Sequence, residues 1–139
     1  MLRFHLPEQK KLVYEMVVPI RWGDMDAMGH VNNAVYFRYF ETVRIDWMRS
    51  IGALPGPDGI GPVIVNAFCS FIRQLEYLGE CWAKHYVANR AAPSFDTYLT
   101  LERTDQPGVI YSEGGRRRWV DLPKQKSVPL PDWVRKIVE

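Results

Sequence analysis

The chain has 139 residues, which is the length of one ordinary domain. Its 18 Lys and Arg against 16 Asp and Glu leave a formal net charge of +2, and that surplus is too small to indicate a nucleic-acid or acidic-membrane partner. Hydrophobic residues make up 47% and charged residues 24%, a balance that is typical of globular proteins and excludes a disordered chain. We therefore expect a single domain spanning residues 1–139, with no nucleic-acid and no membrane partner.

Cysteine content and apolar run lengths bear on the cellular compartment. Cys69 and Cys81 could form at most one disulfide, so the chain is not a disulfide-stabilised scaffold. Residues 1–11 are polar and do not resemble a secretory signal. The longest apolar stretches are far too short to span a bilayer. These features predict a cytoplasmic protein.

The first predicted element is a strand over residues 12–22. Apolar and aromatic side chains alternate along it and share one face: Leu12, Tyr14, Met16, Val18, Ile20 and Trp22. Pro19 cannot donate a ladder hydrogen bond, which favours an edge strand or a strand end at that point. Residues 1–11 before it are expected to be a flexible arm or an added strand.

A helix is predicted over residues 34–50. At 100° per residue, its large apolar side chains fall on one stripe, and polar side chains occupy the opposite face. The stripe holds Tyr36, Phe40, Val43 and Trp47, with Phe37 and Met48 beside it, and the polar face holds Arg38, Thr42, Asp46 and Arg49. Asn32 and Asn33 are natural N-cap candidates. The apolar arc is wide, so we expect a sheet to wrap around this helix.

The remaining chain is predicted to form strands joined by turns. The patterns predict strands over residues 61–75, 81–89, 95–103 and 109–121, and then a short helix near the C-terminus, over residues 131–139. Tight turns between the later strands favour antiparallel pairing. The predicted fold class is α+β, with one long central helix wrapped by a five-stranded antiparallel sheet.

The densest group of polar side chains lies in residues 21–33, directly before the helix. Asp24, Asp26 and His30 belong to it. A helix N-terminus offers unpaired N–H groups and a partial positive charge, so it can stabilise an oxyanion, and a carboxylate beside it could act as a base or nucleophile. Two alternatives stay open, namely that the aspartates only cap turns, or that these side chains bind a metal. The metal alternative lacks a second group of ligands, because His5 and His85 lie in unrelated contexts.

Other motifs favour ordinary structural roles. The chain contains no nucleophile elbow, phosphate-binding loop, dinucleotide fingerprint or metal-spaced cysteine pair, so no cofactor is expected. The arginines at 116–118 are more typical of a solvated strand end than of a phosphate clamp. Glu41 and Arg44, three residues apart on the helix, are expected to form a local pair with no role in catalysis.

Three stretches of sequence are similar to a known family. Residues 21–26 (Arg-Trp-Gly-Asp-Met-Asp), residues 29–33 (Gly-His-Val-Asn-Asn) and residues 36–44 resemble the acyl-CoA thioesterases of the hotdog fold, in the 4-hydroxybenzoyl-CoA thioesterase-like group. The tail around residues 119–121 and 127–131 is similar as well. In that family two subunits join their sheets, and an acyl-CoA substrate binds at the dimer interface.

The resemblance implies a role for each residue of the loop. It assigns the catalytic carboxylate to Asp26 and the oxyanion donor to the backbone N–H at Asn33, and it leaves Asp24 with a structural role. It implies that further residues contact the substrate or shape its site: Gly29, His30, Asn32 and Tyr36. Some family members carry basic residues before a Ser-Phe pair, where they meet the CoA phosphates, but here Ser94-Phe95 follows Ala91-Ala92-Pro93. The residues that meet the CoA phosphates are therefore unassigned.

Several alternatives remain open at this point. Asp26 could activate water or attack the thioester directly. The chain could also bind acyl-CoA or an acyl-carrier protein without catalysis, or act as a hotdog dehydratase, although dehydratases place their Asp and His in the helix itself. The aromatic surplus and Ile45 on the polar helix face predict a homodimer or homotetramer. The sequence does not identify the acyl group.

Overall fold

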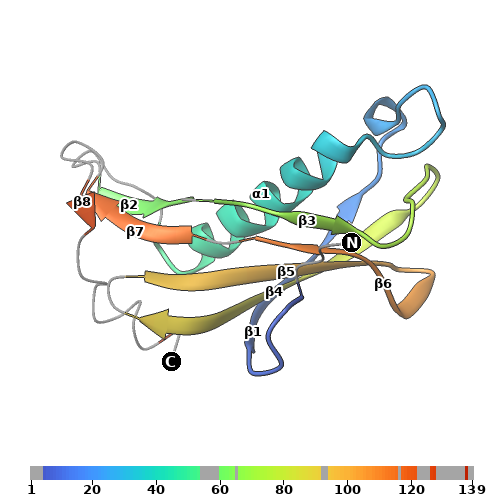
Figure 1. Ribbon diagram of the computed structural model, residues 1–139. Coiled ribbons are helices and arrows are strands. Elements are labelled where there is room, and N and C mark those ends of the chain that lie inside the picture. The colour runs from blue at the N-terminus through green and yellow to red at the C-terminus, as the bar shows by residue number, and fades with distance from the viewer. Residues whose placement is uncertain are drawn as a thin grey trace.

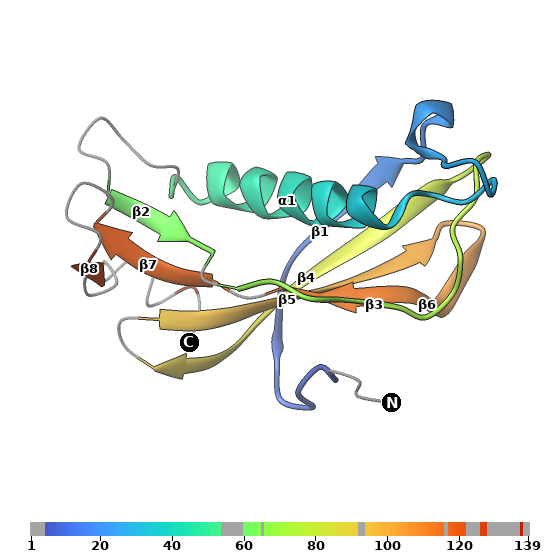
Figure 2. The ribbon, with the colours of Figure 1, turned by 45° about the horizontal axis from the view of Figure 1, so that its top comes forward.

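The computed structural model describes residues 5–53, 60–64, 66–91, 94–115, 117–121, 126–127 and 137. One long helix lies across one face of a twisted sheet (Figures 1 and 2). The elements in chain order are β1 (Lys11–Pro19), the 3-10 helix η1 (Trp22–Asp24), α1 (Asn33–Ser50), β2 (Ile60–Val63), β3 (Cys69–Phe71), β4 (Glu80–Ala91), β5 (Ser94–Arg103), β6 (Gln106–Gly114), β7 (Arg117–Asp121) and β8 (Lys126–Ser127). The predicted α+β class is confirmed.

The sheet is antiparallel and follows the order β1-β4-β5-β6-β3. Its centre is the long pairing of β4 with β5, in which Ala83 lies opposite Leu101. Three short strands extend the sheet near the C-terminal end of α1, where β7 pairs with β2, β5 and β8 (Figure 2). The five-stranded path corresponds to the predicted wrapping sheet, β2 and β7 belong to the same predicted strands as β3 and β6, and β8 is an addition.

Two predicted strands are divided in the structure. The stretch 61–75 forms β2 and β3, and the stretch 109–121 forms β6 and β7. The division of the second stretch coincides with two glycines, Gly114 at the end of β6 and Gly115 directly after it. A Cβ on Gly114 would lie 2.1 Å from the Phe68 carbonyl oxygen, and Gly115 has φ of +109°, a conformation that side-chain-bearing residues rarely adopt. The register shifts by one residue at this point, because Leu99 lies opposite Gly114 whereas Phe95 lies opposite Arg117, and both β6 and β7 stay paired with β5.

The helix matches its prediction closely. It begins at Asn33, one residue earlier than predicted, and Asn32 is the N-cap, because its side-chain oxygen accepts a hydrogen bond from the Ala34 N–H at 2.9 Å. The predicted stripe is buried against the sheet, whereas Arg38, Thr42 and Arg49 are exposed as expected. Gly52, with φ of +73°, follows the last turn.

The core lies between α1 and the sheet. One buried cluster is centred on Phe40 and Val43 with Leu99 and Leu101 of β5, and the other joins Trp47 to Phe95, Val87 and Met48. Burying each such side chain contributes about 1.5–3 kcal/mol to folding. These clusters fix the helix on the sheet and so fix the position of its N-terminus.

Both ends of the chain include residues outside the described ranges. Residues 5–10 contain a bend before β1, and residues 1–4 of the predicted arm lie outside the described residues. Of the predicted C-terminal helix only Ile137 is described, in a helical conformation. In the described ranges, no helix is long and apolar enough to cross a membrane.

Candidate active site

The loop before α1, residues 20–32, is called here the aspartate loop. It starts with η1 and then forms a tight turn closed by an isolated bridge between Met25 and Val31. Within that turn the Asp26 N–H donates to the His30 carbonyl at 2.8 Å, and the Gly29 N–H donates to the Asp26 carbonyl at 3.0 Å. Gly29 has φ of +79° and open space where a Cβ would lie, so its backbone is accessible from outside. The loop therefore has a defined shape with an open backbone surface.

The Asp26 carboxylate is held by its own loop. Oδ1 accepts from the Met28 N–H at 2.9 Å and from the His30 N–H at 3.4 Å. Within the described residues no donor contacts Oδ2, and the side chain is exposed. One carboxylate oxygen is thus fixed while the other is available to an external molecule.

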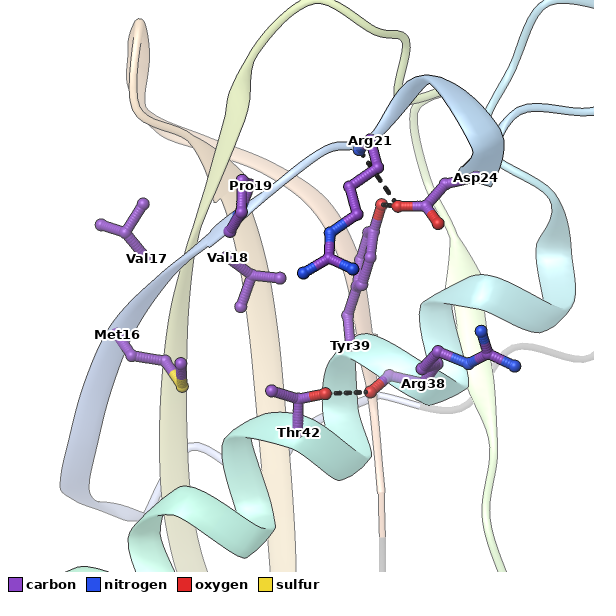
Figure 3. A pocket seen from close by; sticks show the side chains of 9 residues that line it. All are labelled: Met16, Val17, Val18, Pro19, Arg21, Asp24, Arg38, Tyr39 and Thr42. Carbon is purple, nitrogen blue, oxygen red and sulfur yellow. Dashed lines mark hydrogen bonds between the residues drawn. The ribbon is translucent and has the colours of Figure 1, made fainter.

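The Asp24 carboxylate is engaged by the protein itself. Its Oδ2 accepts from the Tyr39 hydroxyl at 2.7 Å and from the Arg21 N–H at 3.1 Å (Figure 3). Burial, and next the bond to Asp24, raise the pKa of Tyr39 well above its ordinary value, so Tyr39 remains a hydrogen-bond donor. Asp24 therefore connects the aspartate loop to the helix.

The N-terminus of α1 has one N–H without an acceptor in the described chain. The Ala34 N–H donates to the Asn32 side chain, and the Val35 N–H donates to the Asn32 carbonyl, each at 2.9 Å. Among the described residues nothing accepts from the Asn33 N–H. A free N–H at the positive end of a helix dipole suits a developing oxyanion.

A second loop, residues 72–79, packs against the aspartate loop and is called here the bracing loop. The Val31 N–H donates to the Leu75 carbonyl at 2.8 Å, and the Ile20 N–H donates to the Gly79 carbonyl at 3.0 Å. The Leu75 N–H in turn donates to the Tyr36 hydroxyl at 3.2 Å. The bracing loop is thereby tied to both ends of the aspartate loop and to the helix.

Two side chains add to the contact between these loops. His30 Nε2 lies 3.5 Å from Glu76 Oε1, a contact that becomes an ion pair when His30 is protonated. The Tyr77 N–H lies 3.2 Å from the Met25 sulfur. His30 therefore faces the bracing loop as well as supporting the Asp26 turn.

Arg103, near the end of β5, holds the bracing loop. Its guanidinium donates to the Glu76 carbonyl at 2.9 Å and to the Leu78 carbonyl at 2.7 Å, and it pairs with Asp105 at 2.9 Å. A Cβ on Gly79 would lie 2.2 Å from Arg103 Nη2, so a side chain at this position would push the guanidinium away from the bracing loop. Sequence reasoning missed Arg103, because its contacts join positions 25 and 27 residues apart and leave no local pattern.

Tyr36 was predicted to contact the substrate, and the structure places it in the core. It is 2% exposed, its ring packs edge-on against Phe71, and burial raises the pKa of its hydroxyl. Its visible role is to connect α1 to the bracing loop through Leu75. A contact with substrate stays a prediction.

A pocket of about 180 Å³ lies on the flank of α1 that faces β1. Its lining residues are Met16, Val17, Val18, Pro19, Arg21, Asp24, Arg38, Tyr39 and Thr42 (Figure 3). Asp26 and Asn33 are not among them, so this pocket is separate from the free carboxylate oxygen and the free N–H.

Metal binding lacks a suitable group of ligands in the part of the chain that the structure describes. There, no three His, Cys, Asp or Glu side chains come together in a way that could hold an ion. Cys69 and Cys81 are free thiols, and burial raises the pKa of each to about 12, so they are poor thiolate ligands at neutral pH.

Comparison with known proteins gives several matches. The protein named "PA2801 protein, a putative Thioesterase" from Pseudomonas aeruginosa has a similar structure, with a TM-score of 0.88, 28% identity, and coverage of 93% of this chain and 100% of that one. A protein named "A putative acyl-CoA thioesterase" from Xanthomonas campestris has a TM-score of 0.77 and 28% identity, covering 86% of this chain and 100% of that one.

Curated sequences match over a shorter stretch. A protein named "Putative esterase" from Aquifex aeolicus is 34% identical over 61 residues, which is 42% of this chain and 48% of that protein. The matched stretch spans less than half the length of the curated relatives.

A family model covers most of the chain. The model described as "Thioesterase-like superfamily" matches residues 20–138, a range that includes the aspartate loop, the helix and the sheet from β2 onward. With the wrapped helix and the similar solved structures, this match confirms the predicted hotdog fold. The chain belongs to the thioesterase-like superfamily.

Proposed function

We propose that this protein hydrolyses acyl-CoA thioesters, with Asp26 as the catalytic carboxylate and the Asn33 N–H as the oxyanion donor. One observation carries the proposal. An exposed carboxylate with an available Oδ2 precedes, by seven positions, a helix-start N–H that has no acceptor among the described residues. These are the two parts that acyl transfer requires.

In the proposed reaction the thioester carbonyl oxygen accepts a hydrogen bond from the Asn33 N–H. As the nucleophile adds to the carbonyl carbon, negative charge moves onto this oxygen, where the helix dipole stabilises it. The carbon–sulfur bond then breaks, and the sulfur takes up a proton to give the CoA thiol. The other product is the free acid.

The nucleophile can reach the carbonyl by two routes. In the first, Asp26 takes a proton from water and the water oxygen adds to the carbonyl carbon. In the second, Asp26 Oδ2 adds directly, CoA leaves, and water hydrolyses the mixed anhydride. A single turnover in H₂¹⁸O tests the second route. Label in the Asp26 carboxylate would establish the anhydride, because it enters only when water attacks the aspartyl carbon, whereas label in the released acid is expected from either route.

The other loop residues position these groups. Gly29 leaves the backbone open next to Asp26, and the His30 N–H helps to fix Oδ1. Asn32 accepts hydrogen bonds from the Ala34 and Val35 N–H groups, so an incoming acceptor would bind the neighbouring Asn33 N–H instead. Gly29, His30 and Asn32 are therefore proposed to shape the substrate site.

We further propose that two subunits associate and share the site, as a homodimer or a homotetramer. Large apolar side chains are exposed around the aspartate loop, the bracing loop and β3, namely Trp22, Met28, Phe37, Phe71, Ile72, Tyr77 and Leu78. Such a concentration of exposed apolar side chains is typical of an interface. Light scattering at micromolar concentration should show a dimer or tetramer, and a strict monomer would contradict the shared site.

Paired aspartate variants test the catalytic assignment. In a thiol-release assay over a panel of acyl-CoAs, Asp26→Asn should lower turnover by roughly 10²-fold or more, because the base or nucleophile is lost. Asp24→Asn is the matched control, since an amide oxygen can still accept from Tyr39 and Arg21, and its turnover should stay within a few-fold of the natural chain. Full activity of a folded Asp26→Asn would contradict the assignment. Acyl-CoA binding without turnover would favour a binding module.

A further inference from the structure

The pocket on the flank of α1 that faces β1 has a size suited to a small ligand. Its volume is about 180 Å³. A cavity of about 150 Å³ holds one benzene ring, whereas drug-sized ligands occupy about 300–1,000 Å³. The pocket can therefore take a molecule with a single ring or a short alkyl chain, and it is too small to enclose the nucleotide part of CoA.

One wall of this pocket is apolar. The side chains of Met16, Val18 and Pro19 line it from β1, and Tyr39 lines it from α1 (Figure 3). Val18 and Tyr39 are 7% and 4% exposed, so the wall is held firmly by the core. An apolar group gains free energy by leaving water for such a wall, whereas a small hydrated ion does not. The ligand therefore needs an apolar body.

The polar lining of the pocket carries more positive than negative charge, because Arg21 and Arg38 face one carboxylate, that of Asp24. Among the described residues no acceptor bonds to either guanidinium group. Figure 3 shows Arg21 reaching toward α1 beside Tyr39, whereas the Arg38 guanidinium points away from Arg21. The Asp24 Oδ2 already accepts from the Tyr39 hydroxyl and the Arg21 N–H. A guanidinium pairs well with a carboxylate, so Arg21 can bind a ligand carboxylate while Arg38 adds positive charge.

We propose that this pocket is a second ligand site, separate from the candidate active site, for a small organic carboxylate whose apolar body is about the size of one benzene ring. The carboxylate pairs with Arg21, and the apolar body lies against the wall formed by β1 and Tyr39. Neither Asp26 nor Asn33 lines the pocket. Binding at this site therefore does not depend on the proposed hydrolysis.

Hydrogen bonds connect this pocket to the aspartate loop. Two of its lining residues bond to each other, since the Tyr39 hydroxyl donates to Asp24 Oδ2 at 2.7 Å. The Asp24 carbonyl accepts from the Asn32 N–H at 2.9 Å, and Asn32 caps α1 directly before Asn33. A ligand that packs on Tyr39 and Asp24 should therefore make opening of the aspartate loop less favourable.

An NMR titration with benzoate tests the site directly. The backbone amide signals of residues 16–18, 21 and 38–42 should shift and saturate as benzoate is added. Benzamide has the same ring without the charge and should bind roughly 5- to 10-fold more weakly, because a hydrogen bond between charged groups is lost at an exposed arginine. Acetate, which lacks the ring, should also bind more weakly than benzoate. Shifts centred instead on Asp26 and Asn33, or equal affinity for benzoate and either comparison ligand, would overturn the proposal.

Two pairs of variants then locate the ligand. Arg21→Met should weaken benzoate binding roughly 5- to 10-fold, whereas Arg49→Met, an exposed change on α1 outside the pocket, should leave it unchanged. Thr42→Phe should fill the pocket and abolish binding, and Thr42→Val, which keeps the side-chain volume, should bind benzoate as the natural chain does.

Hydrogen exchange measures the connection to the aspartate loop. Benzoate should slow the exchange of the amide protons of that loop in the natural chain and not in Thr42→Phe. Benzoate binding that survives in both Arg21→Met and Thr42→Phe would overturn the proposal. None of these measurements uses a thioester, so the ligand site and the proposed hydrolysis can fail separately.

Discussion

Two arginines of this protein are placed in opposite environments. Arg103, at the surface beside the bracing loop, donates to two backbone carbonyls and pairs with Asp105. Arg44, in the core beneath α1, contacts no acceptor within the described residues. The first is held by hydrogen bonds of the fold, and the second makes neither a hydrogen bond nor an ion pair with the described residues.

The contrast separates a guanidinium whose hydrogen bonds hold the structure together, that of Arg103, from one that the described residues do not hydrogen-bond, that of Arg44. Removing a partnered group loses its bonds, whereas removing an unpartnered buried charge relieves a cost. Stability measurements should therefore distinguish the two arginines. Replacing Arg103 should lower the free energy of unfolding, and replacing Arg44 should raise it.

Gly79→Ala should produce the largest loss. The new Cβ would lie 2.2 Å from Arg103 Nη2, and the backbone has φ of +151°, so the variant should lose about 3 kcal/mol of unfolding free energy. Urea denaturation measures this. Gly108→Ala is the control, because Gly108 also has positive φ but nothing within 4 Å of its Cβ position, and it should lose only about 1 kcal/mol. Equal losses would show that the approach of Arg103 is unimportant.

Arg103→Met should follow with a loss of about 2 kcal/mol, because two carbonyls of the bracing loop lose their donor. Turnover should fall as well, since the aspartate loop loses its support. The stability of Arg103→Lys is expected to lie between those of the natural chain and Arg103→Met, because a lysine can keep the Asp105 pair but cannot reach both carbonyls. Unchanged stability in both variants would contradict the bracing role.

Arg44→Met should change stability in the other direction. Methionine fills a similar volume without a charge, so the free energy of unfolding should rise by about 1 kcal/mol, as a matched urea titration can show. Arg49→Met, an exposed change on the same helix, should be nearly neutral. A clear loss of stability in Arg44→Met would mean that the fold itself uses the charge.

Asp105→Asn should have the smallest effect, and that effect should depend on pH. The Arg103 hydrogen bond holds the pKa of Asp105 below its ordinary value of 3.8. A depressed carboxylate pKa stabilises the fold above the unfolded pKa, and this contribution disappears as the pH falls through the folded pKa. The variant should melt slightly below the natural chain at neutral pH and together with it at about pH 2. A difference in melting temperature that stays constant from neutral pH to about pH 2 would exclude the ion pair as its cause.

The sequence predicted those features that local patterns encode. The 100° spacing of Tyr36, Phe40, Val43 and Trp47 identified the helix and its buried face, and Asn32 identified its start. The roles of Asp26 and Asn33 came from a family motif; the structure shows one free oxygen and one free N–H at those positions, which is consistent with those roles but does not test them.

Features that depend on distant residues escaped prediction. The interruption at Gly114 and Gly115 divides the predicted strand 109–121, and it depends on the approach of Gly114 to the distant Phe68 carbonyl. The local pattern paired Arg44 with Glu41, whose charge does favour charged Arg44, but it did not predict that Arg44 is buried beside Gly115. Such contacts exist only after the sheet has closed over the helix.

The hydrogen bonds between the aspartate loop and the bracing loop also bear on how the protein opens. Val31 and Ile20 donate to carbonyls more than forty positions away, at Leu75 and Gly79, so neither loop can detach alone. The two segments should therefore open as one cooperative unit, and their amide protons should exchange with solvent at a common opening free energy. The opening free energy of the candidate site would then depend on Arg103, a residue outside the aspartate loop.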